Sequence, residues 1–114
     1  MKIIYIAGPY RGASESAVFD NIMRAREAAQ RLWSLGWVVI CPHLNSMFMT
    51  GQDNQFLKGD LEILSRCDAI FMLDGWKDSA GASLEYELAI EQQKTDGMEI
   101  YYEAVGYPEC EVIV

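Results

Sequence analysis

Short apolar runs alternate with longer amphipathic stretches along the chain. Four runs have the length and the uniform hydrophobicity of buried strands, and they cover Lys2 to Ala7, Trp37 to Cys41, Ala69 to Leu73 and Glu99 to Tyr102. Gly8-Pro9 and Pro42 mark turns directly after the first two runs. Val112 to Val114 either add an edge strand or continue as irregular chain after Tyr107-Pro108.

Three stretches between these strands repeat apolar residues at helical spacing. They run from a cap at Ser14 or Ser16 to Gly36, from about Gln55 to Arg66, and from about Gly81 to Lys94. The stretch from Leu44 to Asn54 is polar apart from Met47-Phe48-Met49, which is typical of a mobile loop. This loop is a candidate lid.

Apolar strands that alternate with helices predict a parallel sheet covered on both faces. We therefore expect one domain over residues 1–114 with a small doubly wound α/β fold of the flavodoxin or Rossmann type. The sheet is predicted to have four to five strands in the order 2-1-3-4. Ligands bind such sheets beyond the carboxyl ends of the strands, where the strand order reverses. The loops Gly8 to Ala13 and Leu73 to Ser79 are predicted to meet there.

Composition and charge narrow the classes of partner. Seventeen acidic residues against nine Lys and Arg give a net charge of -8, which repels a nucleic-acid polymer and leaves a small ligand allowed. No apolar stretch approaches the roughly 20 residues of a membrane span, and Met1 to Gly8 is too short for a signal peptide. We expect a cytoplasmic protein without a membrane partner. Cys41, Cys67 and Cys110 are predicted to be buried thiols, not disulfide partners or metal ligands.

Glu85 is the most unusual carboxylate of the chain. It follows a loop of small residues, Asp78 to Ser83, and on a helix it lies among Gly81, Ala82, Leu88 and Ala89. Glu87 and Glu91 fall on another side and look like ordinary solvated charges. A carboxylate in apolar surroundings near a helix N-terminus is a candidate nucleophile.

The loop from Gly8 to Ser14 combines flexible backbone, one guanidinium and a hydroxyl ahead of a helix, which suits a monophosphate. A simple turn with a solvated Arg11 and a capping Ser14 explains the same residues equally well. The loop lacks the glycine and lysine spacing of ATP-binding and NAD-binding loops. Neither cofactor is therefore favoured.

Five further side chains invite a role. Asp60 borders an apolar stripe and needs either a structural partner, such as Arg66, or a catalytic function. Ser79 is a helix cap or a phosphate contact, and His43 is more typical of a structural histidine. Tyr5 packs in the core or orients a carboxylate, and Tyr10 orients a carboxylate or stacks on a base.

Three motifs occur in order over nearly the whole chain. They are Tyr5 to Gly12, Asp60-Leu61 followed by Cys67 to Ile70, and Ser79-x-Gly81-x-x-x-Glu85-x-x-x-Ala89. With this order and spacing the chain resembles the nucleoside 2-deoxyribosyltransferase-like superfamily. It is most similar to a compact subgroup from bacteria and phages whose activity is generally unassigned.

The resemblance implies a reaction. The family's glutamate, matched by Glu85, attacks C1′ of a nucleoside or nucleotide, and the base leaves a glycosyl-enzyme that water or another base resolves. The family's aspartate, matched by Asp60, positions the reacting groups, and Tyr5 approximately matches a tyrosine at the end of the first strand. No metal or organic cofactor is implied, and a homodimer is expected.

The resemblance also implies a substrate class. In nucleotide N-hydrolases the first loop and a serine hold the 5′-phosphate, and here the matching residues are Arg11, Gly12 and Ser79. Ser79 favours a nucleoside 5′-monophosphate, because transferases of free nucleosides often carry aspartate at that position. The predicted substrate-binding residues are therefore Gly8, Tyr10, Arg11, Gly12, Ser79 and Gly81.

Two alternatives belong to other classes. A non-catalytic nucleotide-binding module is favoured by Glu87, which replaces a common glycine of the family. An interaction protein would use the Met47-Phe48-Met49 loop as an exposed apolar contact. In an enzyme, we expect the Leu44 to Asn54 loop and Trp76 to select the base.

Overall fold

The computed structural model describes residues 1–47 and 49–110, without the side chain of residue 53. Within this part of the chain, four parallel strands form one sheet in the order β2-β1-β3-β4. The strands are β1 (Ile3–Ala7), β2 (Val38–Ile40), β3 (Ala69–Met72) and β4 (Glu99–Tyr102). The predicted doubly wound α/β fold and its strand order are confirmed. The predicted strand at 112–114 lies outside the described residues.

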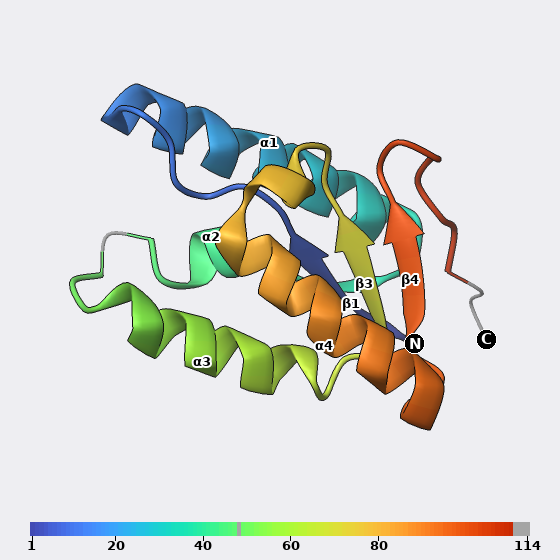
Figure 1. Cartoon of the computed structure of the whole chain (residues 1–114). Helices are drawn as coiled ribbons and strands as arrows, with labels where there is room; N and C mark the ends of the chain where they lie inside the picture. Colours follow the sequence, from blue (N-terminus) through green and yellow to red (C-terminus); the bar gives the residue numbers. More distant parts are fainter. Residues whose placement is uncertain (48, 111–114) are drawn as a thin grey trace.

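Three long helices cover the two faces of the sheet. They are α1 (Glu15–Ser34), α3 (Asp53–Leu64) and α4 (Ala80–Asp96). Helix α1 lies on one face, and α3 and α4 lie on the other (Figure 1). Ser14, not Ser16, caps α1 by accepting a hydrogen bond from the Ala17 amide at 3.1 Å, and Ser79 caps α4 in the same way.

Alternate residues of the central strands enter two separate cores. Ile4 and Phe71 belong to the core under α1, whereas Tyr5 and Ile70 belong to the core under α3 and α4. All four are fully buried. Because side chains alternate along a strand, this register turns Tyr5 toward the face on which α4 carries Glu85.

Two short helices replace parts of the predicted loops. Helix α2 (Pro42–Asn45) starts directly after β2, and its proline at the first turn favours helix initiation because the ring presets φ. Helix α3 begins at Asp53, so the predicted loop from Leu44 to Asn54 was wrong at both of its ends. A 3-10 helix, η1 (Trp76–Asp78), lies between β3 and α4. Phe48 of the predicted apolar contact lies outside the described residues.

The chain after β4 returns across the α1 side of the sheet as irregular backbone. The Tyr107 ring packs on Phe71 with 4.8 Å between ring centroids. The Trp37 indole donates a hydrogen bond to the Pro108 carbonyl at 2.8 Å. Cys110 in this segment is buried, as predicted, whereas Cys41 and Cys67 are only partly buried, and none of the three forms a disulfide. Among the described helices, none is long and apolar enough to cross a membrane.

Candidate active site

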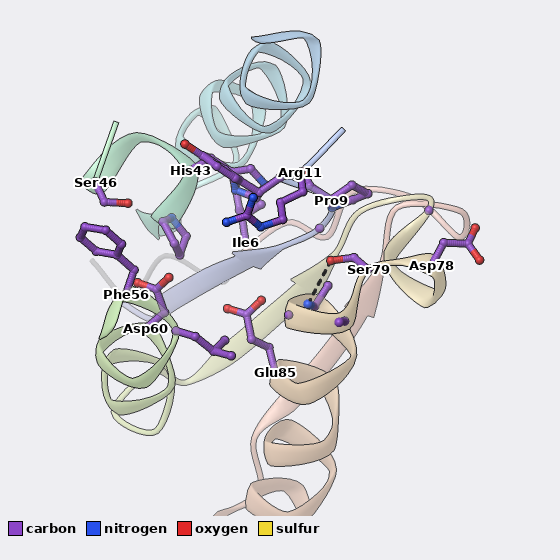
Figure 2. Close-up of a pocket in the computed structure, with 18 of the residues that line it drawn as sticks. Ile6, Pro9, Arg11, His43, Ser46, Phe56, Asp60, Asp78, Ser79 and Glu85 are labelled. Carbon is purple, nitrogen blue, oxygen red and sulfur yellow. Dashed lines mark hydrogen bonds between the residues drawn. The ribbon is translucent and has the colours of Figure 1, made fainter. Parts of the chain in front are cut away.

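A cavity of about 490 Å³ opens at the carboxyl ends of the central strands (Figure 2). Its walls come from Gly8 to Arg11, helix α2, the first turns of α3, and Gly75 with Asp78 to Ala82. The two loops nominated by the strand order therefore meet here, as predicted. A volume of this size is typical of a site for a small molecule.

Glu85 lies in this cavity, one turn inside α4, and is only 7% exposed. The buried Tyr5 hydroxyl on β1 donates a hydrogen bond to Glu85 Oε2. Tyr5 thus packs in the core and orients a carboxylate at the same time. The contact joins a rigid central strand to the helix, which fixes the carboxyl group in one orientation.

Burial dominates the electrostatics of Glu85. It raises the pKa of this carboxyl to about 8, the nearby Asp60 charge acts in the same direction, and the Tyr5 hydrogen bond partly opposes them. Burial and the adjacent Glu85 charge raise the pKa of Tyr5, so its hydroxyl stays protonated and remains a donor. A carboxyl with so strongly shifted a pKa inside a cavity marks a candidate functional group.

Asp60 of α3 faces Glu85 across the cavity (Figure 2). It is half-buried, and burial raises its pKa to about 6. Arg66, the alternative structural partner, instead forms an ion pair with Glu62 at 2.7 Å. Two carboxyl groups from different helices therefore share one pocket, and their titrations influence each other.

The opposite end of the cavity carries the groups predicted to hold a phosphate. Ser79 lines it and caps α4, with its Oγ 3.2 Å from the Ala82 nitrogen. In Figure 2 the Arg11 side chain reaches over the cavity, whereas the Asp78 carboxylate points away from it. A guanidinium and a helix N-terminus at one end of a pocket suit an anionic group.

The remaining predicted residues divide into two groups. Gly8, Tyr10 and Gly81 line the cavity. Gly12 is not among the lining residues, because it packs against α1: a Cβ placed on it would lie 2.5 Å from the Ala17 Cβ. The structure gives Gly12 a packing reason that local sequence does not reveal.

His43 makes a structural contact, as expected, whereas Trp76 lies away from the cavity that it was predicted to line. His43 lines the cavity, is 5% exposed, and donates from Nε2 to the Pro9 carbonyl at 3.0 Å. Burial lowers its pKa, which keeps the ring neutral. Its position in α2, directly after Pro42 and three residues beyond the carboxyl end of β2, was the sequence feature that could have placed it at the cavity. Trp76 is absent from the lining and stacks on Tyr86 at 4.4 Å, and Glu87 is exposed.

One wall of the cavity is apolar. Met49, Phe56 and Leu57 give one side of the cavity an apolar surface. Met49 belongs to the segment predicted to select the base, and the other two come from α3. Over the part of the chain that the structure describes, no group of three His, Cys, Asp or Glu side chains could hold a metal ion.

The parallel sheet and the cavity at its carboxyl edge define an α/β protein with a cavity where folds of this class bind ligands. The chain belongs to the family described as a domain of unknown function, DUF4406, whose model matches residues 2–102. A comparison with curated proteins gave no match.

Among solved structures, the chain is similar to a 2-deoxyribosyltransferase from the psychrotolerant bacterium Bacillus psychrosaccharolyticus. The TM-score is 0.59 at 23% sequence identity, over 98% of this chain and 77% of the other. At this identity the likeness establishes a shared fold.

Proposed function

We propose that this protein cleaves the N-glycosidic bond of a nucleoside 5′-monophosphate through a glycosyl-enzyme intermediate on Glu85. The observation that carries the proposal is the buried Glu85, held by the Tyr5 hydroxyl inside a cavity that also contains Asp60. The fold shared with a 2-deoxyribosyltransferase supports a nucleoside as the sugar-bearing part of the substrate.

The chemistry follows that of retaining glycosidases. An ionised Glu85 oxygen attacks C1′, the bond from C1′ to the base nitrogen breaks, and its electron pair leaves with the base, which takes up a proton. Water, or a second base, then attacks C1′ and releases the carboxylate. Negative charge on Glu85 and Asp60 stabilises the oxocarbenium-like sugar in both transition states.

The phosphate is assigned to the end of the cavity that holds Arg11 and Ser79. Arg11 supplies a positive charge, and the N-terminus of α4 supplies backbone amide groups and the positive end of the helix dipole. A serine at the cap adds no negative charge at its own position, and the neighbouring Asp78 turns its carboxylate away from the cavity (Figure 2). These features favour a monophosphate over a free nucleoside.

Chromatography of reaction mixtures tests the proposal. The protein is incubated with each ribo- and deoxyribonucleoside 5′-monophosphate, with and without a second free base. Release of base indicates hydrolysis, and a new nucleotide that carries the added base indicates transfer. Glu85→Gln keeps the shape of the side chain but removes the nucleophile, so we expect base release to fall to background.

Two results would contradict this assignment. Turnover by Glu85→Gln at the rate of the unmodified protein would remove Glu85 as the nucleophile. A rise in melting temperature with a nucleotide, without any base released, would identify a binding module instead.

A further inference from the structure

Asp74, the second residue after β3, has both of its main-chain polar groups bound by side chains from other elements. Its amide donates a hydrogen bond to Glu103 Oε1 at 3.0 Å. Its carbonyl accepts one from Arg24 Nη2 at 3.2 Å. Since Arg24 lies on α1 and Glu103 follows β4, two distant segments of the chain hold the main chain on both sides of one residue, Asp74.

The two side chains are themselves restrained. Arg24 and Glu103 form an ion pair at 3.7 Å, and the Glu103 side chain is only 22% exposed. The Tyr107 hydroxyl donates to the second oxygen of Glu103 at 2.7 Å, and the Arg31 guanidinium stacks on the Tyr107 ring at 4.2 Å. The Arg24 side chain is 48% exposed, but a network with several partners restrains its members more than an isolated surface ion pair does.

This network lies directly behind one wall of the cavity. Asp74 is followed by Gly75, whose φ of +88° places it in the left-handed region that favours glycine, and Gly75 lines the cavity. The wall then continues through Asp78 to Ser79. A shift of the Asp74 peptide would therefore move the cap of α4.

The opposite loop is held from the same helix. Asn21 of α1 donates hydrogen bonds from Nδ2 to the carbonyls of Tyr10 and Arg11, both at 3.2 Å. Asn21 and Arg24 are three residues apart, so they lie on one face of α1. One helix face thus contacts both loops at the end of the cavity that holds Arg11 and Ser79.

We propose that Arg24 and Glu103 are positioning residues for the substrate cavity. By fixing the Asp74 peptide, they set the distance between the wall that ends at Ser79 and the loop that carries Arg11. Neither residue lines the cavity, so their influence on a substrate passes through the main chain. The inference about substrate rests on the proposed function, whereas the inference about the loop does not.

Hydrogen exchange of the ligand-free protein tests the loop. The variants are Arg24→Met and Glu103→Leu, with Arg66→Met as the matched control because Arg66 forms an exposed ion pair far from the cavity. We expect exchange in residues 74–79 to become about tenfold faster in the two variants, as follows from the loss of a hydrogen bond to a charged group. Exchange in β1 and in the control should not change. Unchanged exchange in residues 74–79 would overturn the proposal.

Kinetics tests the consequence for the substrate. We expect KM for the nucleotide to rise about tenfold in Arg24→Met and Glu103→Leu, with kcat changed by less than about threefold. Glu103→Gln keeps an acceptor oxygen and should recover most of the lost affinity. A fall in kcat with unchanged KM would overturn the positioning role.

The two proposals fail in different ways. If the unmodified protein releases no base, the proposed reaction is wrong, and the nucleotide-induced rise in melting temperature replaces KM as the readout. A rise that is equal in the unmodified protein and in both variants would then overturn the positioning role.

Discussion

The Glu85 carboxyl has a pKa of about 8, so most of the protein carries it protonated at neutral pH. A nucleophile must be ionised, and this shift therefore sets the pH at which the proposed reaction can run. Asp60, with a pKa of about 6, ionises first and its charge then opposes ionisation of Glu85. With these two carboxyl groups, we expect activity to rise with pH and stability to fall.

Activity should rise with pH. We expect kcat/KM for base release to increase through about pH 8, as Glu85 loses its proton. Burial is the main cause of the raised pKa of Glu85, and the Asp60 charge adds to it. Asp60→Asn removes that charge, so the rise in kcat/KM should move to lower pH. Steady-state rates from pH 5.5 to 9.5 give the pH at which kcat/KM rises in the unmodified protein and in Asp60→Asn. The same pH in both would show that the Asp60 charge does not affect the pKa of Glu85.

Stability should fall over the same range. A carboxyl whose pKa is raised on folding stabilises the native state below its unfolded pKa, here 4.5, and this contribution is lost as pH rises through about 8. The shift corresponds to at most about 5 kcal/mol of unfolding free energy. Urea unfolding at pH 5 and pH 8.5 should therefore show a large loss in the unmodified protein and a much smaller one in Glu85→Gln. Parallel losses would exclude Glu85 as the source.

At the scale of elements, periodicity predicted what is long and amphipathic. Helices α1 and α3 were found because their apolar positions recur at helical spacing, whereas the four strands were found as short, uniformly apolar runs. Helix α2 and η1 contain four and three residues, too few for a period to be seen. Proline at the start of α2 was a local signal, but a turn explained it as well.

The site divides in the same way. Arg11 and Ser79 were predicted from loops that topology brings together, whereas Glu85 and Asp60 were predicted as carboxylates beside apolar positions of their helices. The packing role of Gly12 and the network around Asp74 depend on residues far apart in sequence, and no local pattern contains them. Trp76 was misplaced because η1 turns its side chain toward Tyr86.

Two glycines should respond oppositely to alanine. Gly59 lies inside α3, and a Cβ placed there would meet no atom within 4 Å, so Gly59→Ala should stabilise the protein by about 0.5 to 1 kcal/mol. Gly12→Ala should destabilise it, because its Cβ would approach the Ala17 Cβ to 2.5 Å. Thermal unfolding of both variants checks the pair. Equal shifts of the same sign would show that backbone freedom, not packing, governs both positions.

At the scale of the whole molecule, the two cores share one sheet. Ile70 and Phe71 are neighbours on β3, yet they enter different cores, so neither core forms without the strand that carries the other. The single domain over residues 1–114 stays a prediction. The predicted homodimer stays a prediction. Sedimentation at several protein concentrations measures the oligomeric state.

One cooperative transition should follow from the shared sheet. We expect a single calorimetric peak whose calorimetric and van't Hoff enthalpies agree, because disruption of either core breaks the strands of the other. Scanning calorimetry at two heating rates provides the measurement. Two resolved peaks would mean that the α1 side and the α4 side unfold independently.

The place of β1 in the sheet also affects how the chain is made. Of the four described strands, β1 is synthesised first and is a central one, and its partner on one side, β3, is synthesised only after α1, β2 and α3. Until Ala69–Met72 arrives, Ile3–Ala7 keeps an open row of amide and carbonyl groups on an almost wholly apolar strand. A nascent chain paused before β3 is therefore the form most exposed to aggregation and most in need of a chaperone.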